Sequence, residues 1–388
     1  MLRTAAFSVG LALAALCATA PARAEDLLQI YREAQVNDPT LAAARATWNA
    51  VQEFVPQARA GLLPNVNAAG SANVNNLNEH VRSSPPLDIN NRNYALGQLS
   101  VSASQPLFRV QNKVAYDQAK QQVAQADYTL SSVQQDLILR VAIAYFDVLL
   151  AEFNVELADS QKSAVSEQLA QAKRNFEVGV ATITDTNEAQ ARYDSIAAQE
   201  ITSRNDLDNR RTALRAIIGR TPPPLKRLGR GFEPVLPEPN SADSWVDRAL
   251  ADNITVKIAS YNVDIATLEI DRQKAGHLPT VDLVGSYSHQ VGSGAANFSN
   301  GFDLRQRQIG VQLNVPIYQG GLINSRIRQA IAQQDNARQN LEVARRVALF
   351  NAQTGFSGVN SAAASVKAFE QAVVSAQVAY DSNRVGQE

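Results

Sequence analysis

Four segments of the chain alternate between apolar and polar residues. They cover approximately residues 64–77, 94–107, 279–289 and 307–317. In the last segment Ile309, Val311 and Leu313 alternate with glutamine, glycine and asparagine. A period of two places the apolar side chains on one face of a β-strand and the polar ones on the other. Segments of about ten residues can cross a membrane when tilted, although the same pattern also fits a soluble hairpin with one face on a core.

After the second of these segments the period becomes that of an α-helix. Small and branched apolar residues recur every three or four positions, which is typical of a coiled-coil seam. No proline or glycine occurs from Gln111 to Glu177, which predicts a helix over about 110–178, roughly 100 Å long at 1.5 Å per residue. Gly179 interrupts this pattern. A return helix is predicted over about 185–218, and a further long helix starts at about residue 321.

The chain also contains an internal repeat. The sequence AGLLPNV at 60–66 recurs as AGHLPTV at 275–281. A period this long indicates gene duplication rather than a solenoid. Between the copies lies a proline-rich connector, residues 219–245, that no helix or central strand would accept. We therefore divide the chain into a first structural repeat, 25–218, which opens with a helix, and a second one, 246–388.

The second repeat is shorter than the first. By the repeat offset Glu388 corresponds to Glu177, so the second copy lacks a counterpart of the tip turn and of the return helix. An apolar seam without its partner helix is hard to stabilise. The alternative is a last helix that stays open and unpaired, and we favour the interpretation that the second repeat is truncated at its C-terminus.

Residues 1–24 have the features of a secretory signal peptide. Arg3 precedes a short apolar run, and Ala22-Arg23-Ala24 forms a cleavage site of the A-x-A type. The apolar run is too short for a membrane anchor, and nothing after Ala24 approaches the length of a transmembrane helix. We therefore expect an exported protein without a helical anchor.

Composition and charge exclude several other classes of protein. The chain has 36 basic and 37 acidic residues, a balance that argues against nucleic-acid binding. Its single cysteine, Cys17, lies in the signal peptide and excludes a disulfide framework. Three histidines leave little material for a histidine metal site. No G-x-S-x-G, H-E-x-x-H or P-loop motif is present, so we expect no enzyme activity, cofactor or metal.

Four strands cannot close a membrane barrel, because an open sheet edge in lipid leaves backbone groups without hydrogen bonds. The smallest barrels need about eight strands. If these strands span a membrane, several chains must share one barrel, which the helices extend as a hollow cylinder. The alternative is a soluble periplasmic coiled-coil adaptor or structural protein, which would share the long helices but would not need two pairs of alternating strands.

Six motifs resemble the TolC family of outer-membrane efflux and secretion channels. They are VGVATITD (178–185), ARYD (191–194), RNDLDN (204–209), GHLPTVDL (276–283), PIYQGG (316–321) and QAVVSAQ (371–377), in the family's order. The resemblance implies an α+β membrane protein, a homotrimer in which four strands per chain form one twelve-stranded β-barrel in outer-membrane lipid. The barrel would continue into a long α-helical coiled-coil tunnel in the periplasm. The implied function is a passive exit duct for multidrug efflux or type I secretion, fed by a periplasmic adaptor (membrane fusion) protein and an ABC or proton-driven inner-membrane transporter.

The resemblance also implies a set of entrance residues. In the family, polar contacts between neighbouring coiled coils close the periplasmic tip of the tunnel. Matched by motif, Gln168, Thr184 and Asp185 occupy the first-half side of this latch. Asp185 also falls at the start of the return helix, where free N–H groups favour an anion. A plain helix cap is therefore the alternative, and the two roles can coexist.

Overall fold

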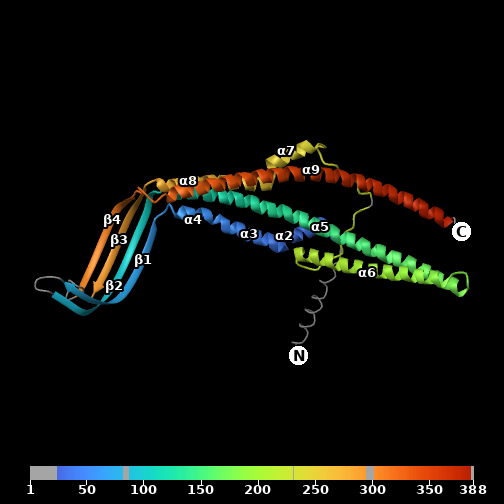
Figure 1. Cartoon of the computed structure of the whole chain (residues 1–388), viewed down its shortest axis with the longest axis horizontal. Coiled ribbons are helices and arrows are strands. Elements are labelled where there is room, and N and C mark those ends of the chain that lie inside the picture. Colours follow the sequence, from blue (N-terminus) through green and yellow to red (C-terminus); the bar gives the residue numbers. More distant parts are fainter. Residues whose placement is uncertain (1–23, 82–86, 230, 294–300, 386–388) are drawn as a thin grey trace, which may run out of the picture. The chain divides into compact units, whose positions relative to one another are not determined.

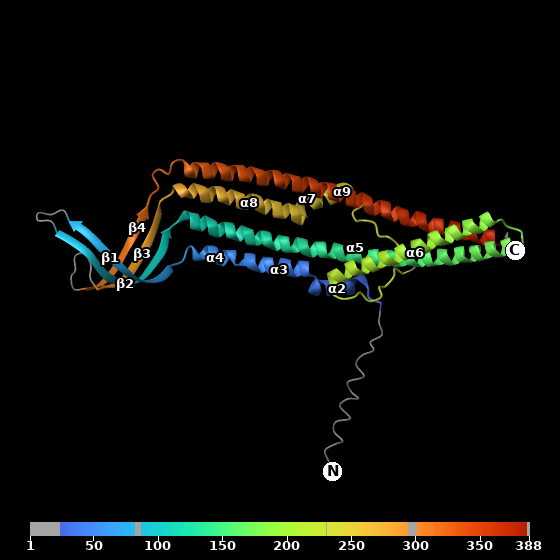
Figure 2. The same ribbon diagram turned by 60° about the horizontal axis from the view of Figure 1, so that its bottom comes forward.

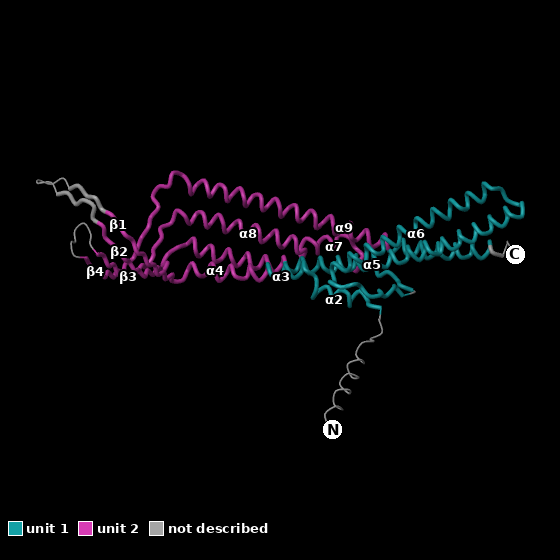
Figure 3. The backbone as a smooth tube through the Cα atoms, turned by 90° about the horizontal axis from the view of Figure 1, so that it is seen from below, with its two compact units in different colours: residues 1–47, 130–236, 363–388 teal, residues 48–129, 237–362 magenta. Residues whose placement is uncertain are grey.

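The computed structural model describes residues 24–81, 87–229, 231–293 and 301–385, so that the predicted signal peptide lies outside the described residues except for Ala24. Its elements (Figure 1) are, in chain order, α2 (Leu27–Asn37), α3 (Pro39–Gln52), α4 (Phe54–Ala60), β1 (Asn65–Val81), β2 (Leu87–Phe108), α5 (Val110–Glu177), α6 (Ile183–Ile218), α7 (Ala242–Asp252), α8 (Ile254–Lys274), η1 (Ala275–His277), β3 (Thr280–Gly292), β4 (Phe302–Asn314) and α9 (Leu322–Val385). They form two compact units (Figure 3). Unit 1 consists of residues 1–47, 130–236 and 363–388, and unit 2 of residues 48–129 and 237–362.

The four strands of unit 2 form one antiparallel sheet in the order β1-β2-β3-β4 (Figure 1). Residues paired directly across neighbouring strands share a face. Val66 pairs with Ala103, which pairs with Gly285, and Gly285 pairs with Ile309. This register makes one face apolar across all four strands, while the other carries mainly Asn, Ser and Gln. The apolar face consists of Val66, Ala68, Gly70, Ala72 and Val74 of β1, Ala95, Gly97, Leu99, Val101 and Ala103 of β2, Val281, Leu283 and Gly285 of β3, and Ile309, Val311 and Leu313 of β4.

The ends of the strands differ from those that the alternation predicts. β2 begins at Leu87, ahead of the segment 94–107, because its backbone pairs with β1 beyond the region of regular alternation. β4 runs from Phe302 to Asn314 and therefore ends before the predicted limit at residue 317. Pro316 has no N–H to donate to a neighbouring strand, and Gly320 and Gly321, both with positive φ, turn the chain into the next helix.

Long helices make up most of the remaining chain, as the heptad-like pattern predicts. α5 has 68 residues, α6 has 36 and α9 has 64. α6 ends at Ile218, and the C-cap residue that follows it, Gly219, adopts a φ of 80° that glycine tolerates without steric strain. Among the described residues no helix contains a segment long and apolar enough to cross a membrane.

The apolar core of unit 1 lies where α2 packs against α5 and the C-terminal end of α6 (Figure 2). Its side chains with no exposed surface are Ile30 and Ala34 of α2, Leu137 and Val141 of α5, and Leu214 and Ile218 of α6. The Tyr145 hydroxyl donates to the carbonyl oxygens of Lys226, at 2.6 Å, and of Glu25, at 3.3 Å. These bonds fasten the start of the connector and the segment before α2 to the middle of α5.

A buried ion pair accompanies this core. Asp38, between α2 and α3, accepts hydrogen bonds from the Leu41 N–H at 2.7 Å and from Arg140 at 3.0 and 3.3 Å. The Asp38 side chain is only 2% exposed. Burial raises the pKa of Asp38, but the bonds from Arg140 and Leu41 lower it more, so the pKa lies below its ordinary value.

Candidate functional site

The candidate site lies at the tip of the hairpin that α5 and α6 form in unit 1. Ion pairs between the two helices fix their register. They are Arg210–Asp147 (2.9 Å), Arg211–Glu152 (2.9 Å), Arg204–Asp159 (3.1 Å) and Lys162–Glu200. The hydrogen bond between Lys162 and Glu200 lowers the pKa of Glu200 and raises the pKa of Lys162. Both side chains therefore stay charged at neutral pH.

The turn at the tip begins at Gly179, whose φ is 80°. The N–H groups of Val180 and Ala181 both donate to the carbonyl oxygen of Asn175, at 2.8 and 3.2 Å. These bonds satisfy an end of α5 that would otherwise expose free carbonyl groups. The turn is therefore a defined reversal of only a few residues.

Asp185 and Thr182 form a capping box at the start of α6. The Asp185 carboxylate accepts from the Thr182 N–H and hydroxyl, both at 2.8 Å, and the Asp185 N–H donates back to the hydroxyl at 3.2 Å. The hydrogen bond from the Thr182 N–H, and to a smaller extent the one from the Thr182 hydroxyl, lowers the pKa of Asp185. The return helix thus begins at Ile183, two residues before the predicted start at 185, because Thr182 is the N-cap and Asp185 is its third helical residue.

Two of the three predicted latch residues share one hollow. Gln168 of α5 and Asp185 of α6 both line a depression of about 160 Å³ between the helices, whereas Thr184 is exposed and is not part of its lining. Both Thr182 bonds reach Oδ2 of Asp185, so within the described chain its Oδ1 accepts no hydrogen bond. The hollow therefore presents an exposed carboxylate oxygen beside an amide side chain.

Sequence reasoning missed two further residues of this hollow. Glu188 and Arg192 of α6 line it and form an ion pair at 3.0 Å. Their spacing of four residues, with the acid first, is the arrangement that stabilises a helix surface and could have identified them. The pair adds one positive and one negative group to the rim of the hollow.

Unit 2 contains an apolar groove between α7 and α9, the α7–α9 groove, with a volume of about 430 Å³. Its lining residues are Pro237, Trp245, Arg248, Ala249, Asp252, Asn253, Asn351, Ala352, Gly355, Phe356 and Val359. All of them belong to the second copy of the internal repeat or to the connector before it.

Five of the eleven lining residues of this groove are repeat counterparts of residues in the unit 1 core. Trp245 and Ala249 stand 215 positions after Ile30 and Ala34. Likewise, Ala352, Phe356 and Val359 stand 211 positions after Val141, Tyr145 and Val148. In unit 1 the end of α6 packs on these positions and buries them. The α7–α9 groove is therefore the open equivalent of a core that is filled in the first repeat.

Comparison with known proteins places this architecture among membrane channels. The family model described as outer membrane efflux protein matches residues 30–220 and 245–388. The chain is 34% identical to the outer membrane protein TolC of Vibrio cholerae, over 94% of this chain and 81% of that protein. It is 33% identical to TolC of Escherichia coli, over 94% and 74%, and 30% identical to the proteases secretion protein PrtF of Dickeya chrysanthemi, over 94% and 79%.

Solved structures share the fold at lower sequence identity. The CusC channel superposes with a TM-score of 0.73 at 18% identity, covering 91% of this chain and 80% of that one. The outer membrane protein VceC of Vibrio cholerae superposes with a TM-score of 0.70 at 19% identity, covering 90% and 83%. The predicted combination of four strands per chain with long helices is confirmed by these structures and by the sheet described above.

Proposed function

The chain belongs to the outer membrane efflux protein family, and from this premise we propose that it forms the exit duct of a tripartite efflux pump or a type I secretion system. The family and outer-membrane location implied by the sequence motifs are confirmed. The duct conducts its substrates passively and catalyses no reaction. Export depends on the predicted signal peptide, residues 1–24.

The sheet indicates that several chains share one barrel. β1 and β4 are edge strands, and the apolar face is exposed in the single chain, with Val66 at 67% and Ile309 at 80% exposure. A lipid environment accepts an apolar face but not an open sheet edge. Copies of the chain must therefore pair β1 of one with β4 of the next. Three copies close a twelve-stranded barrel, as in the family, with the Asn-, Ser- and Gln-rich face toward the water-filled lumen.

The partners follow from the family. A periplasmic adaptor protein joins the duct to an inner-membrane transporter, of the ABC or the proton-driven kind, which supplies the energy. The relatives named above include a proteases secretion protein, and the matching family model is described as outer membrane efflux protein, so we infer that the partner transporter sets the substrate. The alternative function, a soluble coiled-coil adaptor, would not need a sheet with one apolar and one polar face.

Reconstitution in planar bilayers tests this function. The purified protein is expected to produce stable conductance steps, because the polar interior of the barrel provides an aqueous path across the membrane. Membrane fractionation provides the companion measurement, with the protein expected in the outer-membrane fraction. Absence of conductance at every voltage, or recovery in the soluble periplasm, would contradict the proposal.

We also propose that Gln168, Thr184 and Asp185 contribute to a latch between neighbouring hairpins at the periplasmic entrance. Within the described residues Oδ1 of Asp185 accepts no hydrogen bond, and Gln168 lines the same hollow, which supports this role for two of them. Thr184 is exposed on the first turn of α6, where it can reach a neighbouring chain but not the shared hollow.

Asp185→Ala is expected to raise single-channel conductance and antibiotic sensitivity several-fold. Thr182→Ala is the matched control, because it removes the hydroxyl that caps the Asp185 N–H but leaves the Asp185 carboxylate at the tip. If the carboxylate acts as a latch, Asp185→Asn behaves like Asp185→Ala and Thr182→Ala stays near wild type. Equal effects of Thr182→Ala and Asp185→Ala, with Asp185→Asn unchanged, would reduce the role of Asp185 to helix capping.

We further propose that a return helix equivalent to α6 completes the second repeat. The α7–α9 groove supports this, because its lining matches positions that Leu214 and Ile218 of α6 cover in unit 1. A helix end carrying two aliphatic residues four positions apart would fill the groove in the same way.

A further inference from the structure

The apolar face of the sheet ends in a charged cluster toward the C-terminal end of β3. The register pairs Tyr287 with Arg307 and His289 with Arg305, on the same face as the apolar residues. His289 Nε2 lies 2.8 Å from one carboxylate oxygen of Asp303, and Arg305 donates to the other at 3.4 Å. The Arg307 guanidinium lies 5.9 Å from the centre of the Tyr287 ring. We call Asp303, Arg305 and Arg307 the basic rim.

Positive charge is in excess at the basic rim. Two guanidinium groups face one carboxylate, and Asp303 is already bonded to His289 and Arg305. The Arg305 side chain is 66% exposed, so most of its five N–H donors remain available. Arg307 is oriented by an aromatic ring rather than by an acid. This arrangement suits an anion with several oxygen acceptors, such as a phosphate group.

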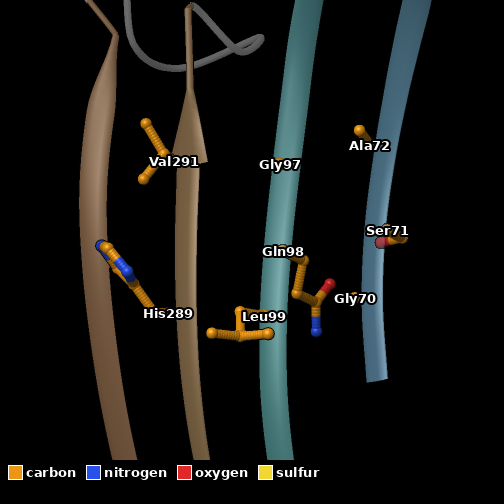
Figure 4. Close-up of a pocket in the computed structure, with 8 residues that line it drawn as sticks. All are labelled: Gly70, Ser71, Ala72, Gly97, Gln98, Leu99, His289 and Val291. Atoms are coloured by element: carbon orange, nitrogen blue, oxygen red, sulfur yellow. The ribbon is translucent and has the colours of Figure 1, made fainter. Parts of the chain in front are cut away.

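A shallow hollow lies beside the basic rim, since two of its lining residues, His289 and Val291, pair with Arg305 and Asp303 (the hollow is shown in Figure 4). It has a volume of about 480 Å³ and is lined by Gly70, Ser71, Ala72, Gly97, Gln98, Leu99, His289 and Val291. The surface recedes there because Gly70, Ala72 and Gly97 have little or no side chain, whereas Leu99 and His289 stand at its edge. Its size falls within the range of ligand pockets, about 300–1,000 Å³. The hollow is therefore lined mainly by small and apolar residues, and His289 connects it to the basic rim.

The basic rim also lies at a defined height on the sheet. Leu313, on the apolar face near the helices, is eight residues from Arg305 along β4. At about 3.4 Å per residue and a tilt of about 40°, this corresponds to roughly 20 Å across the membrane, close to the upper edge of an apolar band about 25 Å tall. Long basic side chains at that level extend toward the headgroups.

We propose that the hollow and the basic rim together bind one phosphorylated lipid of the outer leaflet. An acyl chain lies over Gly70 and Gly97, and the headgroup phosphate is bound by Arg305 and Arg307. The site belongs to a single chain, since β1, β2 and β3 form the hollow and the adjacent β4 the rim. This inference rests on the proposed function, which turns the apolar face toward lipid.

Native mass spectrometry of the detergent-solubilised trimer, titrated with diphosphorylated lipid A, tests the proposal. The wild type is expected to bind one lipid per chain, and Arg305→Gln/Arg307→Gln to weaken binding about tenfold through loss of the charge-assisted bonds. Arg326→Gln/Arg328→Gln, at two exposed α9 residues, is the control for the loss of two charges alone. Gly97→Leu fills the hollow without changing charge, and a Cβ there meets its nearest atom, the Val291 carbonyl oxygen, at an ordinary 3.8 Å. It is expected to weaken binding several-fold.

Three outcomes would overturn the lipid site. One is unchanged lipid binding in both the arginine and the Gly97→Leu variants. Another is full competition by millimolar inorganic phosphate, which would reduce the site to an ion site without the acyl chain. The third is equal binding of phosphatidylcholine, whose headgroup has no net charge. Planar-bilayer conductance of the same variants is expected to match the wild type. Loss of wild-type conductance would contradict the duct itself, whatever the lipid result.

Discussion

Ile309→Arg is expected to prevent assembly in the outer membrane, whereas Gln308→Arg is expected to leave assembly almost unchanged. Ile309 lies on the apolar face, 80% exposed in the single chain and paired with Gly285. An arginine on the lipid face of a barrel costs about 2–4 kcal/mol near the midplane. Each trimer would bear that cost in all three chains. The measurement is the amount of heat-stable trimer in outer-membrane fractions, resolved on semi-native gels.

The neighbouring residue provides the matched control for this substitution. Gln308 pairs with Ser286 on the opposite face of the same strand, where water in the lumen would solvate a guanidinium. The two variants therefore carry the same added charge on opposite sides of one sheet. Assembly of Ile309→Arg together with failure of Gln308→Arg would mean that the faces are reversed. Equal levels of both would contradict a membrane-spanning sheet.

The two faces of the sheet could be predicted from the sequence because a period of two assigns sides directly. The limits of the strands could not. From Asn90 to Asn93 four consecutive polar residues interrupt the apolar–polar alternation, yet the backbone of β2 still pairs with β1 at Arg92 and Asn93. In β4 the apolar residues Val315 and Ile317 continue the alternation past the strand, which ends because Pro316 cannot donate a hydrogen bond. Side-chain pattern and backbone pairing are thus separate constraints.

The candidate site, like the strands, could be predicted from the sequence only in part. Glycine at the turn and an acid at the helix start follow from backbone conformation and from the helix dipole. Which threonine caps the helix depends on the turn geometry, and here Thr182 rather than a later residue does so. The latch role of Gln168, Thr184 and Asp185 stays a prediction, because it depends on side chains of a neighbouring copy, whereas periodicity and capping rules describe one chain.

The two halves of the internal repeat differ in one pair of polar residues. Asn253 is the repeat counterpart of Asp38 and caps α8, accepting from the N–H groups of Thr255 and Val256 at 2.9 and 3.2 Å. Asn351 stands 211 positions after Arg140. The first half thus uses a buried charge pair where the second has two amides. Only the structure shows that Asp38 and Arg140, distant in the sequence, are in contact.

Asp38→Ala is expected to lower the free energy of unfolding by about 3 kcal/mol, because it removes the cap of α3 and leaves Arg140 without its main partner. Asn253→Ala, which removes only a cap, is expected to cost about 1 kcal/mol. Asp38→Asn, which imitates the second half, should lie between them. Urea unfolding of the detergent-solubilised protein, followed by circular dichroism, measures all three. Equal losses for Asp38→Ala and Asn253→Ala would show that the ion pair contributes nothing beyond the cap.

The pH dependence of the same variants separates the charge of Asp38 from its shape. Its pKa is lower in the folded chain than in the unfolded one, despite burial, because Arg140 and the Leu41 N–H stabilise the carboxylate. The stabilisation is therefore fully present above the unfolded pKa, about 4, and is lost as the pH falls through the lower folded value. Wild type is expected to exceed Asp38→Asn in stability at pH 7, and the difference is expected to shrink below about pH 4. A difference that stays constant down to pH 2 would assign the effect to packing rather than to charge.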